Sequence, residues 1–346
     1  MASIKSAKKQ PRARLPAHMQ YKAPLAQHAH GKGADEDVVD IKPIDNWLDK
    51  IFCGDCRQLM RQLPERSVDL VIADPPYWKV AKEQWDFRWR LESDYISWSR
   101  EWVREVARVV KPTGAFYIFG YYRMLAYLVP HIEEAGFLFR QQLIVHKGAR
   151  ALGGRATRGY KMFPNVTECI LFFEYDNRPE VRACLKERQR ALGLTARQIN
   201  DRLGVKSNGG GVWSLYTGDN ILATIPTEEM WGRLQWVLRF DKPYSEIGHT
   251  FNIEMGVTDV WNDIDFYAEK RYHSTQKPVG LIARLVRASS NPGMLVLDPF
   301  VGAGSTALAA KREGRHYIGF ESNPDYVEIC RRRLSGEQAA QQRSLL

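Results

Sequence analysis

The chain has 346 residues, of which 44% are hydrophobic and 26% charged, and its formal net charge is +10. This length is sufficient for one large or two modest domains with a sizeable core. We find no apolar run long enough to span a bilayer and no signal peptide, so we expect a cytoplasmic protein without a membrane partner. The excess of basic residues points to a polyanionic partner, most often a nucleic acid.

Residues 1–45 are dominated by Lys, Arg, Ala, Pro, His and Gln, and we predict that they form a basic, disordered tail. Such a tail either adds nonspecific attraction to phosphates or is a solvated segment without a role. The five cysteines, in a chain without an export signal, indicate reduced thiols. Cys53-Gly-Asp-Cys56 has the spacing of a ligand pair but no second pair nearby, so we predict no metal site.

Short apolar segments alternate with amphipathic ones on both sides of a central region. The alternation predicts strands over 49–55, 68–77, 114–120, 137–147, 165–175, 293–300 and 316–321. Helices are predicted over 57–65, 93–112, 122–136, 279–290, 305–314 and 323–334. For the helix over 93–112 we expect Ser93 or Asp94 as the cap and Pro112 as the stop. This pattern predicts an α/β fold with a mostly parallel sheet and helices on both faces.

The central region, residues 177–269, breaks this alternation. Helices are predicted over 180–193, 195–204 and 226–240, with Gly193 and Gly204 closing the first two. Between them a glycine-rich turn leads into a segment in which Trp213 and Tyr216 look exposed. We therefore expect a mostly helical insert in the α/β domain.

The stretch "ADPPYW" ends the apolar strand that begins at Val68. Proline cannot donate a hydrogen bond to a sheet, so the strand must stop there and continue as a rigid, extended loop. That loop carries the carboxylate of Asp74 and the rings of Tyr77 and Trp78. A strand terminator with surface aromatics is the simplest interpretation, and a binding site is the alternative.

A second informative stretch, "LDPFVGAGSTALAA", runs from a strand into a helix. Gly302 and Gly304 follow Asp298, and glycines at such a turn let the backbone approach a ligand closely. Glu321 ends the next strand, where an acid can accept both ribose hydroxyls of a nucleoside-containing cofactor. The same pattern also fits a helix-packing turn or the dinucleotide site of an oxidoreductase.

Taken in order, "FCGDC", "DPPY", "HSTQKP" and "DPFVGAGST…GFE" resemble the amino-group DNA methyltransferases of the permuted beta class. The resemblance implies a Rossmann-like, circularly permuted S-adenosylmethionine-dependent methyltransferase sheet. The catalytic half would span 46–176, the target-recognition insert 177–269 and the cofactor-binding half 270–336, with a tail over 337–346. It also implies a bacterial or phage-encoded enzyme, monomeric or homodimeric, that acts on double-stranded DNA, with or without a cognate restriction endonuclease.

The reaction implied by the resemblance is methylation of adenine N6 or, less often, cytosine N4. The Asp74 carboxylate and the carbonyl of Pro75 or Pro76 would accept hydrogen bonds from the target amino group, and Tyr77 would stack on the flipped base. In this family Asp at the first position of the tetrapeptide goes mainly with adenine, so we expect the adenine reaction. N4-cytosine methylation and a DNA-binding regulator with an inactive core remain the alternatives.

The resemblance also assigns the cofactor-binding residues. Glu321 would hold the ribose hydroxyls and Asp55 would lie near the adenine of S-adenosylmethionine. The methionine part would be lined by Asp298, Phe300, Gly302 and Gly304, with Lys277 at its carboxylate. Ser305 and Thr306 begin the following helix; contact with the ligand is one role open to them, and capping of the helix is the role we expect.

The predicted insert resembles the helix-turn-helix of phage-repressor-like proteins, although the recognition-helix position is glycine-rich. Candidate DNA contacts in the insert are Lys206, Ser207, Asn208, Trp213 and Arg233. A basic, glycine-rich loop offers Arg155, Arg158 and Lys161 to phosphates. A small helical subdomain and a solvated loop, respectively, are the alternatives to these two DNA contacts.

Overall fold

The computed structural model describes residues 39–78, 84–152, 161, 163–205, 211–219, 222–272 and 275–344. Its described part contains one eight-stranded sheet in the order β1-β8-β7-β2-β3-β5-β4-β6. The strands are β1 (Lys50–Cys53), β2 (Val68–Ala73), β3 (Val110–Gly120), β4 (Phe137–His146), β5 (Thr167–Tyr175), β6 (Val260–Trp261), β7 (Leu295–Asp298) and β8 (His316–Glu321). The pairings are parallel except that β5 runs antiparallel to both of its neighbours.

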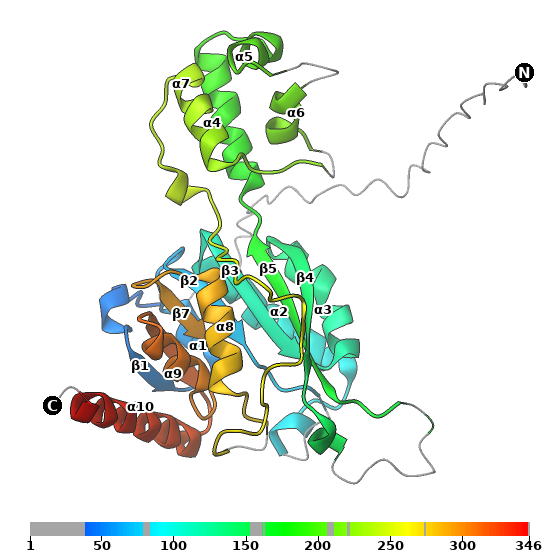
Figure 1. Cartoon of the computed structure of the whole chain (residues 1–346), viewed down its shortest axis with the longest axis vertical. Helices are drawn as coiled ribbons and strands as arrows, with labels where there is room; N and C mark the ends of the chain where they lie inside the picture. Colours follow the sequence, from blue (N-terminus) through cyan, green and yellow to red (C-terminus); the bar gives the residue numbers. More distant parts are fainter. Residues whose placement is uncertain are drawn as a thin grey trace, which may run out of the picture. The chain divides into compact units, whose positions relative to one another are not determined.

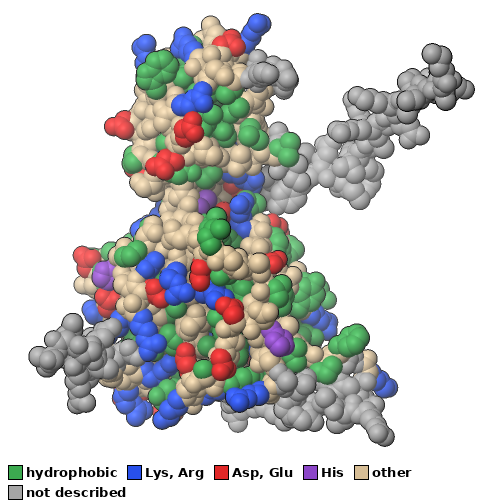
Figure 2. Space-filling model, in the orientation of Figure 1, with side chains coloured by type: hydrophobic (Ala, Val, Ile, Leu, Met, Phe, Trp, Pro, Cys, Tyr) green, Lys and Arg blue, Asp and Glu red, His purple; other side chains and the backbone are tan. Residues whose placement is uncertain are grey.

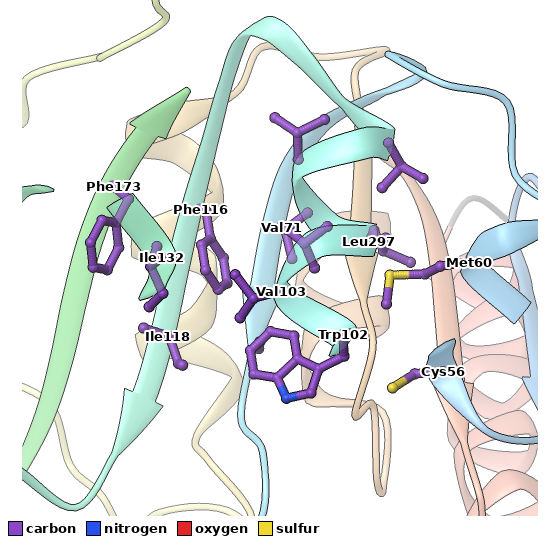
Figure 3. Packing of buried hydrophobic residues seen from close by; sticks show 14 of the residues in the cluster. Cys56, Met60, Val71, Trp102, Val103, Phe116, Ile118, Ile132, Phe173 and Leu297 are labelled. Carbon is purple, nitrogen blue, oxygen red and sulfur yellow. The ribbon is translucent and has the colours of Figure 1, made fainter. Parts of the chain in front are cut away.

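Helices cover both faces of this sheet, as the alternating pattern predicts (Figure 1). One core packs the sheet against α1 (Cys56–Arg61), α2 (Glu92–Val109) and α3 (Tyr122–Glu134). Figure 3 shows part of it, with Trp102 and Val103 of α2 pointing at Val71 and Phe116. The second core involves α8 (Val279–Ser289), α9 (Ser305–Arg312) and α10 (Pro324–Ser344).

The central strand β2 explains why the sheet is buried on both sides. Val71 belongs to the first core, whereas its neighbours Leu70 and Ile72 belong to the second. Successive side chains of a strand point to opposite faces, so an unbroken apolar run suits a strand with helices on both sides. β2 lies between β7 and β3, so this strand pairs with one strand from late in the chain and one from its first half.

The bounds of α2 differ from the prediction at both ends. Leu91 is the N-cap, and the Asp94 carboxylate, in the first turn, accepts a hydrogen bond from the Leu91 backbone N–H at 3.2 Å. The expectation of Ser93 or Asp94 as the cap is therefore wrong. The helix ends at Val109, before Pro112, because the chain turns directly into β3 at Val110.

The helices α4 (Arg178–Ala191), α5 (Ala196–Arg202), α6 (Gly211–Thr217) and α7 (Glu228–Leu238) share a third hydrophobic core. Thr195 caps α5 by accepting from the Gln198 N–H, and Gly193 and Gly204 adopt positive φ as predicted for helix ends. Trp213 and Tyr216 lie on α6 and are 4% and 9% exposed. The expectation that they are exposed is wrong, because both rings fill the core of this helical unit.

The helical unit, residues 178–246, leaves the sheet after β5 and returns before β6. A buried hydrogen bond joins its two ends, in which the Asn177 side-chain amide donates to the Ile247 carbonyl at 2.7 Å. No helix in the described ranges is long and apolar enough to cross a bilayer.

Candidate active site

Asp74 immediately follows β2, and its side chain lines two cavities. The larger cavity, about 420 Å³, is lined by Pro75, Tyr77, Tyr121 and Glu168 among others. The smaller one, about 270 Å³, is lined by residues that follow β1, β7 and β8. Asp74, Thr275 and Lys277 line both cavities, so they form the boundary between them.

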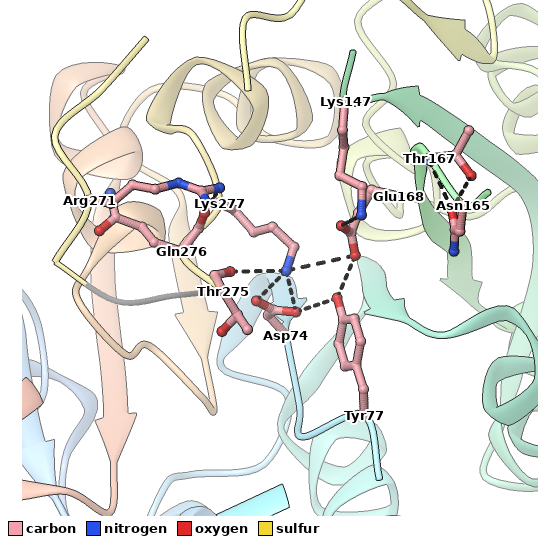
Figure 4. Close-up of polar contacts among 10 residues, drawn as sticks. All are labelled: Asp74, Tyr77, Lys147, Asn165, Thr167, Glu168, Arg271, Thr275, Gln276 and Lys277. Atoms are coloured by element: carbon pink, nitrogen blue, oxygen red, sulfur yellow. Dashed lines mark hydrogen bonds and ion pairs between the residues drawn. The ribbon is translucent and has the colours of Figure 1, made fainter. Parts of the chain in front are cut away.

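The Asp74 carboxylate is held by two side chains (Figure 4). The Lys277 ammonium donates to Oδ1 at 2.9 Å and to Oδ2 at 2.8 Å. The Tyr77 hydroxyl lies 2.7 Å from Asp74 Oδ1. Lys277, which was expected at the carboxylate of a cofactor, lines the smaller cavity, and its ammonium also contacts Asp74, a contact that the sequence does not predict.

Glu168 of β5 is a second acid in this cluster and is not among the residues predicted from the sequence. Its Oε1 lies 2.8 Å from the Tyr77 hydroxyl and 3.8 Å from Lys277 Nζ. Its Oε2 lies 3.3 Å from the ammonium of Lys147, which follows β4. The signal in the sequence was an acid directly before the apolar run "CILFF", because a charge buried in a strand requires a partner.

The electrostatics of the cluster follow from burial and charge pairing. Burial by itself would lower the pKa of Lys277, but the carboxylates of Asp74 and Glu168 outweigh it and raise this pKa. Burial would likewise raise the pKa of Glu168, but Lys277 and Lys147 lower it. Burial, reinforced by the two carboxylates, raises the pKa of Tyr77 well above its usual value. The cluster therefore holds two carboxylates, two ammonium groups and a neutral phenol.

The two prolines after Asp74 present different carbonyl groups. The Pro76 carbonyl accepts a hydrogen bond from the Tyr95 hydroxyl of α2 at 2.7 Å. Pro75 lines the larger cavity and Pro76 the smaller one. Trp78 packs against the first core and its indole N–H donates to the Trp89 carbonyl at 3.2 Å. Trp78 therefore anchors the loop.

The smaller cavity contains the predicted acids at the ends of β7 and β8. Glu321 accepts hydrogen bonds from the Gly302 N–H at 3.1 Å and from the Asn323 N–H at 2.8 Å, and burial raises its pKa. Asp298 accepts from the Phe300 N–H at 2.9 Å, and burial raises its pKa to about 7. A buried and a partly buried carboxyl group beside an aromatic ring suit a ligand with a cationic group, hydroxyls and a flat ring.

Other predicted cofactor residues have additional or different roles. Asp55 lines the smaller cavity, but it also caps α1 and pairs with Arg57 at 2.6 Å, which lowers the pKa of Asp55. Gly302 lines this cavity, whereas Gly304 is not among the described residues that do. Gly304 caps α9 with a φ of +89°, and a Cβ there would collide with the Cys330 sulfur.

Ser305 and Thr306 were expected to cap α9, and that expectation is wrong. The N-cap position is occupied by Gly304. The Ser305 hydroxyl donates to the Lys277 carbonyl at 2.7 Å, and the Thr306 hydroxyl bonds to Asp298. Ser305 therefore links the glycine turn to Lys277, and Thr306 links it to Asp298.

The structure gives the predicted DNA contacts unequal support. Arg155, Arg158, Lys206, Ser207 and Asn208 lie outside the described residues, and Lys161 is exposed. Trp213 is buried, and Arg233 donates to the Leu203 carbonyl within the helical unit. Tyr121 and Tyr122, which follow β3 and line the larger cavity, are 43% and 64% exposed and were not predicted.

Comparison with known proteins identifies the family. A sequence profile of the DNA methylase family (N6_N4_Mtase) matches residues 68–332. The Type II methyltransferase M.HpaI of Haemophilus parainfluenzae is 27% identical over 289 residues, covering 83% of this chain and 74% of its own. The Type II methyltransferase M.HinfI of Haemophilus influenzae is 26% identical over 308 residues, covering 84% and 69%.

The fold is also that of a known DNA methyltransferase. The cytosine-N4-specific PvuII DNA methyltransferase aligns with a TM-score of 0.50 at 17% identity, covering 81% of this chain and 84% of its own. The α/β architecture is thus a Rossmann-like methyltransferase fold. Its family uses S-adenosylmethionine as the cofactor. From the profile match, which extends over most of the sequence, we conclude that this chain belongs to the DNA methylase family.

Proposed function

We propose that this chain transfers a methyl group from S-adenosylmethionine to the N6 amino group of adenine in double-stranded DNA, as a member of the permuted beta class. The observation that carries the proposal is the position of Asp74 on the boundary between two cavities. A flipped base in the larger cavity and a cofactor in the smaller one would meet at this carboxylate.

The smaller cavity fits the cofactor. S-adenosylmethionine carries cationic groups, ribose hydroxyls and an adenine ring, and when bound it supplies an electrophilic methyl group. Glu321 would accept from the ribose hydroxyls, and Asp298, Phe300 and Gly302 would line the methionine part. Asp55, on the same wall, would lie near the adenine.

The larger cavity fits a base that has left the helix. An exocyclic amino nitrogen is a poor nucleophile because its lone pair is delocalised into the ring. Asp74 and the Pro75 carbonyl would accept its two N–H groups and free that lone pair. Pro75 is the better acceptor of the two prolines, because the Pro76 carbonyl is already bonded to Tyr95. The Tyr77 ring would stack on the base.

The preference for adenine over cytosine rests on Asp74 at the first position of "DPPY". The helical unit would bind DNA as the target-recognition region, which the basic charge of the chain supports. Figure 2 shows Lys and Arg side chains on the visible face of both the helical unit and the α/β part.

The test is nucleoside analysis of unmethylated DNA after incubation with the protein and labelled S-adenosylmethionine. We expect the label in N6-methyladenosine. Label in N4-methylcytosine would keep the mechanism and overturn the base assignment. Bound cofactor without label in DNA would overturn the proposal in favour of an inactive, DNA-binding core.

A further inference from the structure

Asp74, Tyr77 and Glu168 form a line with two oxygen–oxygen hydrogen-bond contacts. Only one proton, that of the Tyr77 hydroxyl, is present to fill them. The Tyr77 oxygen lies 2.7 Å from Asp74 Oδ1 and 2.8 Å from Glu168 Oε1, both hydrogen-bond distances. A neutral phenol has one proton and can donate to only one of these oxygens at a time. The other oxygen–oxygen contact is complete only when a carboxyl group carries an additional proton.

The flanking cations keep the line ready for that proton. Lys277 bonds to Asp74, and Lys147 bonds to Glu168 at 3.3 Å. These two ammonium groups balance both carboxylates, so neither acid requires a proton before the reaction. The phenol stays neutral between them, because burial and then the two carboxylates raise the pKa of Tyr77. In this charge state the line can accept one proton.

Methylation of an amino group releases one proton. The nitrogen lone pair forms the new C–N bond, and the C–S bond pair stays on sulfur, which becomes a neutral thioether. The nitrogen is then cationic, and it becomes neutral when an N–H proton leaves and the bond pair returns to nitrogen. Because the alkylated nitrogen is strongly acidic, the proton leaves toward the adjacent acceptor as the C–N bond forms.

We propose that Glu168 is the final acceptor of this proton, which passes from the amino nitrogen to Asp74 and from Asp74 through the Tyr77 hydroxyl. This inference rests on the proposed function. Asp74 protonates the Tyr77 oxygen while Tyr77 gives its own proton to Glu168, so Asp74 and Tyr77 end in their starting states. The proton stays on Glu168 until the product base leaves the larger cavity, which Glu168 lines.

The relay gives Glu168 a role that packing alone does not explain. Its strand is otherwise apolar between Cys169 and Phe173, and burying a carboxylate there is costly. Returning Asp74 to its ionised form restores its ion pair with Lys277. Transfer of the proton to Glu168 also keeps it away from the Asp74 oxygen, which would otherwise return it to the product nitrogen.

The experiment compares Glu168→Gln, Tyr77→Phe and the double variant in single-turnover methyl transfer, with enzyme in excess over DNA and saturating S-adenosylmethionine. Each single change should lower the rate about tenfold or more. The loss should be smaller than that caused by removing the group that accepts the proton directly. The Kd values for DNA and cofactor, measured separately for each variant, should stay within about twofold of wild type. The double variant should be no slower than the slower single variant, because both changes interrupt one relay.

Glu174→Gln is the matched control. Glu174 lies on the same strand, is 9% exposed and is paired with Arg140 at 3.1 Å, outside the described lining of both cavities. Its rate should stay within about twofold of wild type. The Tyr77→Phe variant leaves β5 unchanged and keeps the relay testable if Glu168→Gln fails to fold. A mixed H₂O/D₂O series should give a curved rate dependence for wild type, because two protons move together, and a linear one for Tyr77→Phe.

The outcomes separate the relay from the proposed function. Wild-type protein that transfers no methyl to DNA would refute both. An active wild type with an unchanged Glu168→Gln rate would refute the relay alone. Losses that multiply in the double variant would also refute it, because Glu168 would then act by a route that does not pass through Tyr77.

Discussion

The buried carboxyl group of Asp298 predicts that cofactor binding is pH-dependent. Burial raises the pKa of Asp298 to about 7, with Asp74 and Glu321 adding to the shift. S-adenosylmethionine is cationic at its sulfonium and ammonium groups, and a nearby cation favours the ionised carboxylate. The empty site is therefore partly protonated near neutral pH, and binding should expel that proton.

The magnitude follows from the fraction of Asp298 that is ionised. With a pKa of about 7, this fraction is about 0.1 at pH 6 and about 0.9 at pH 8. If binding requires the carboxylate, affinity should rise about tenfold over this interval, or about 1.4 kcal/mol. Burial also raises the pKa of Glu321, so a variant is needed that isolates the contribution of Asp298. Asp298→Asn removes only the Asp298 contribution.

Isothermal titration calorimetry of the full chain with S-adenosylmethionine measures both quantities. Repeating it in two buffers of different ionisation enthalpy counts the protons released, which should be about 0.9 at pH 6 and about 0.1 at pH 8. Asp298→Asn should bind more weakly at pH 8 and show a flatter dependence. An affinity in wild type that does not change between pH 6 and 8, or an unchanged slope in Asp298→Asn, would refute the reasoning.

Three further predictions concern the catalytic carboxylate, the charge and the helical unit. Asp74→Ala should abolish methyl transfer while S-adenosylmethionine binding persists, as measured by label incorporation and calorimetry, and full activity would contradict the proposed role. DNA affinity should fall steeply as salt rises, and a flat plot of log K against log salt in fluorescence anisotropy would contradict a phosphate-dominated contact. Trp213→Ala should destabilise the helical unit by about 3–5 kcal/mol and impair DNA binding but not cofactor binding. If DNA binding and cofactor binding were lost to the same extent at each denaturant concentration, the helical unit would not unfold separately.

Much of the fold is predictable because helices and strands differ in their apolar period. β2 is apolar from Leu70 to Ala73 and β7 from Leu295 to Leu297, and such runs suit strands covered on both faces. The direction of a strand leaves no comparable pattern, so the antiparallel orientation of β5 was not predicted. The strand β6 has only two residues, too few for any period to be visible.

The candidate site was predictable where a motif combines a strand end with special residues. Asp74 and Glu321 are acids at strand ends; Asp74 lines both cavities and Glu321 lines the smaller one. The ion pair between Asp74 and Lys277 joins residues 203 positions apart, and only the folded sheet brings them together. Trp213 looked exposed beside a glycine run, but a large ring contributes more stability inside the small helical core.

The hydrogen bond between Asn177 and Ile247 makes the helical unit an exchangeable module. Because its two ends meet at one buried contact, the sheet is sensitive to the separation of those ends and hardly to the length or fold of what lies between them. We therefore expect that another unit with the same end spacing could replace residues 178–246 without shifting the register of β5. In the proposed function, a change of target preference made in the helical unit would then leave the methyl-transfer site unchanged.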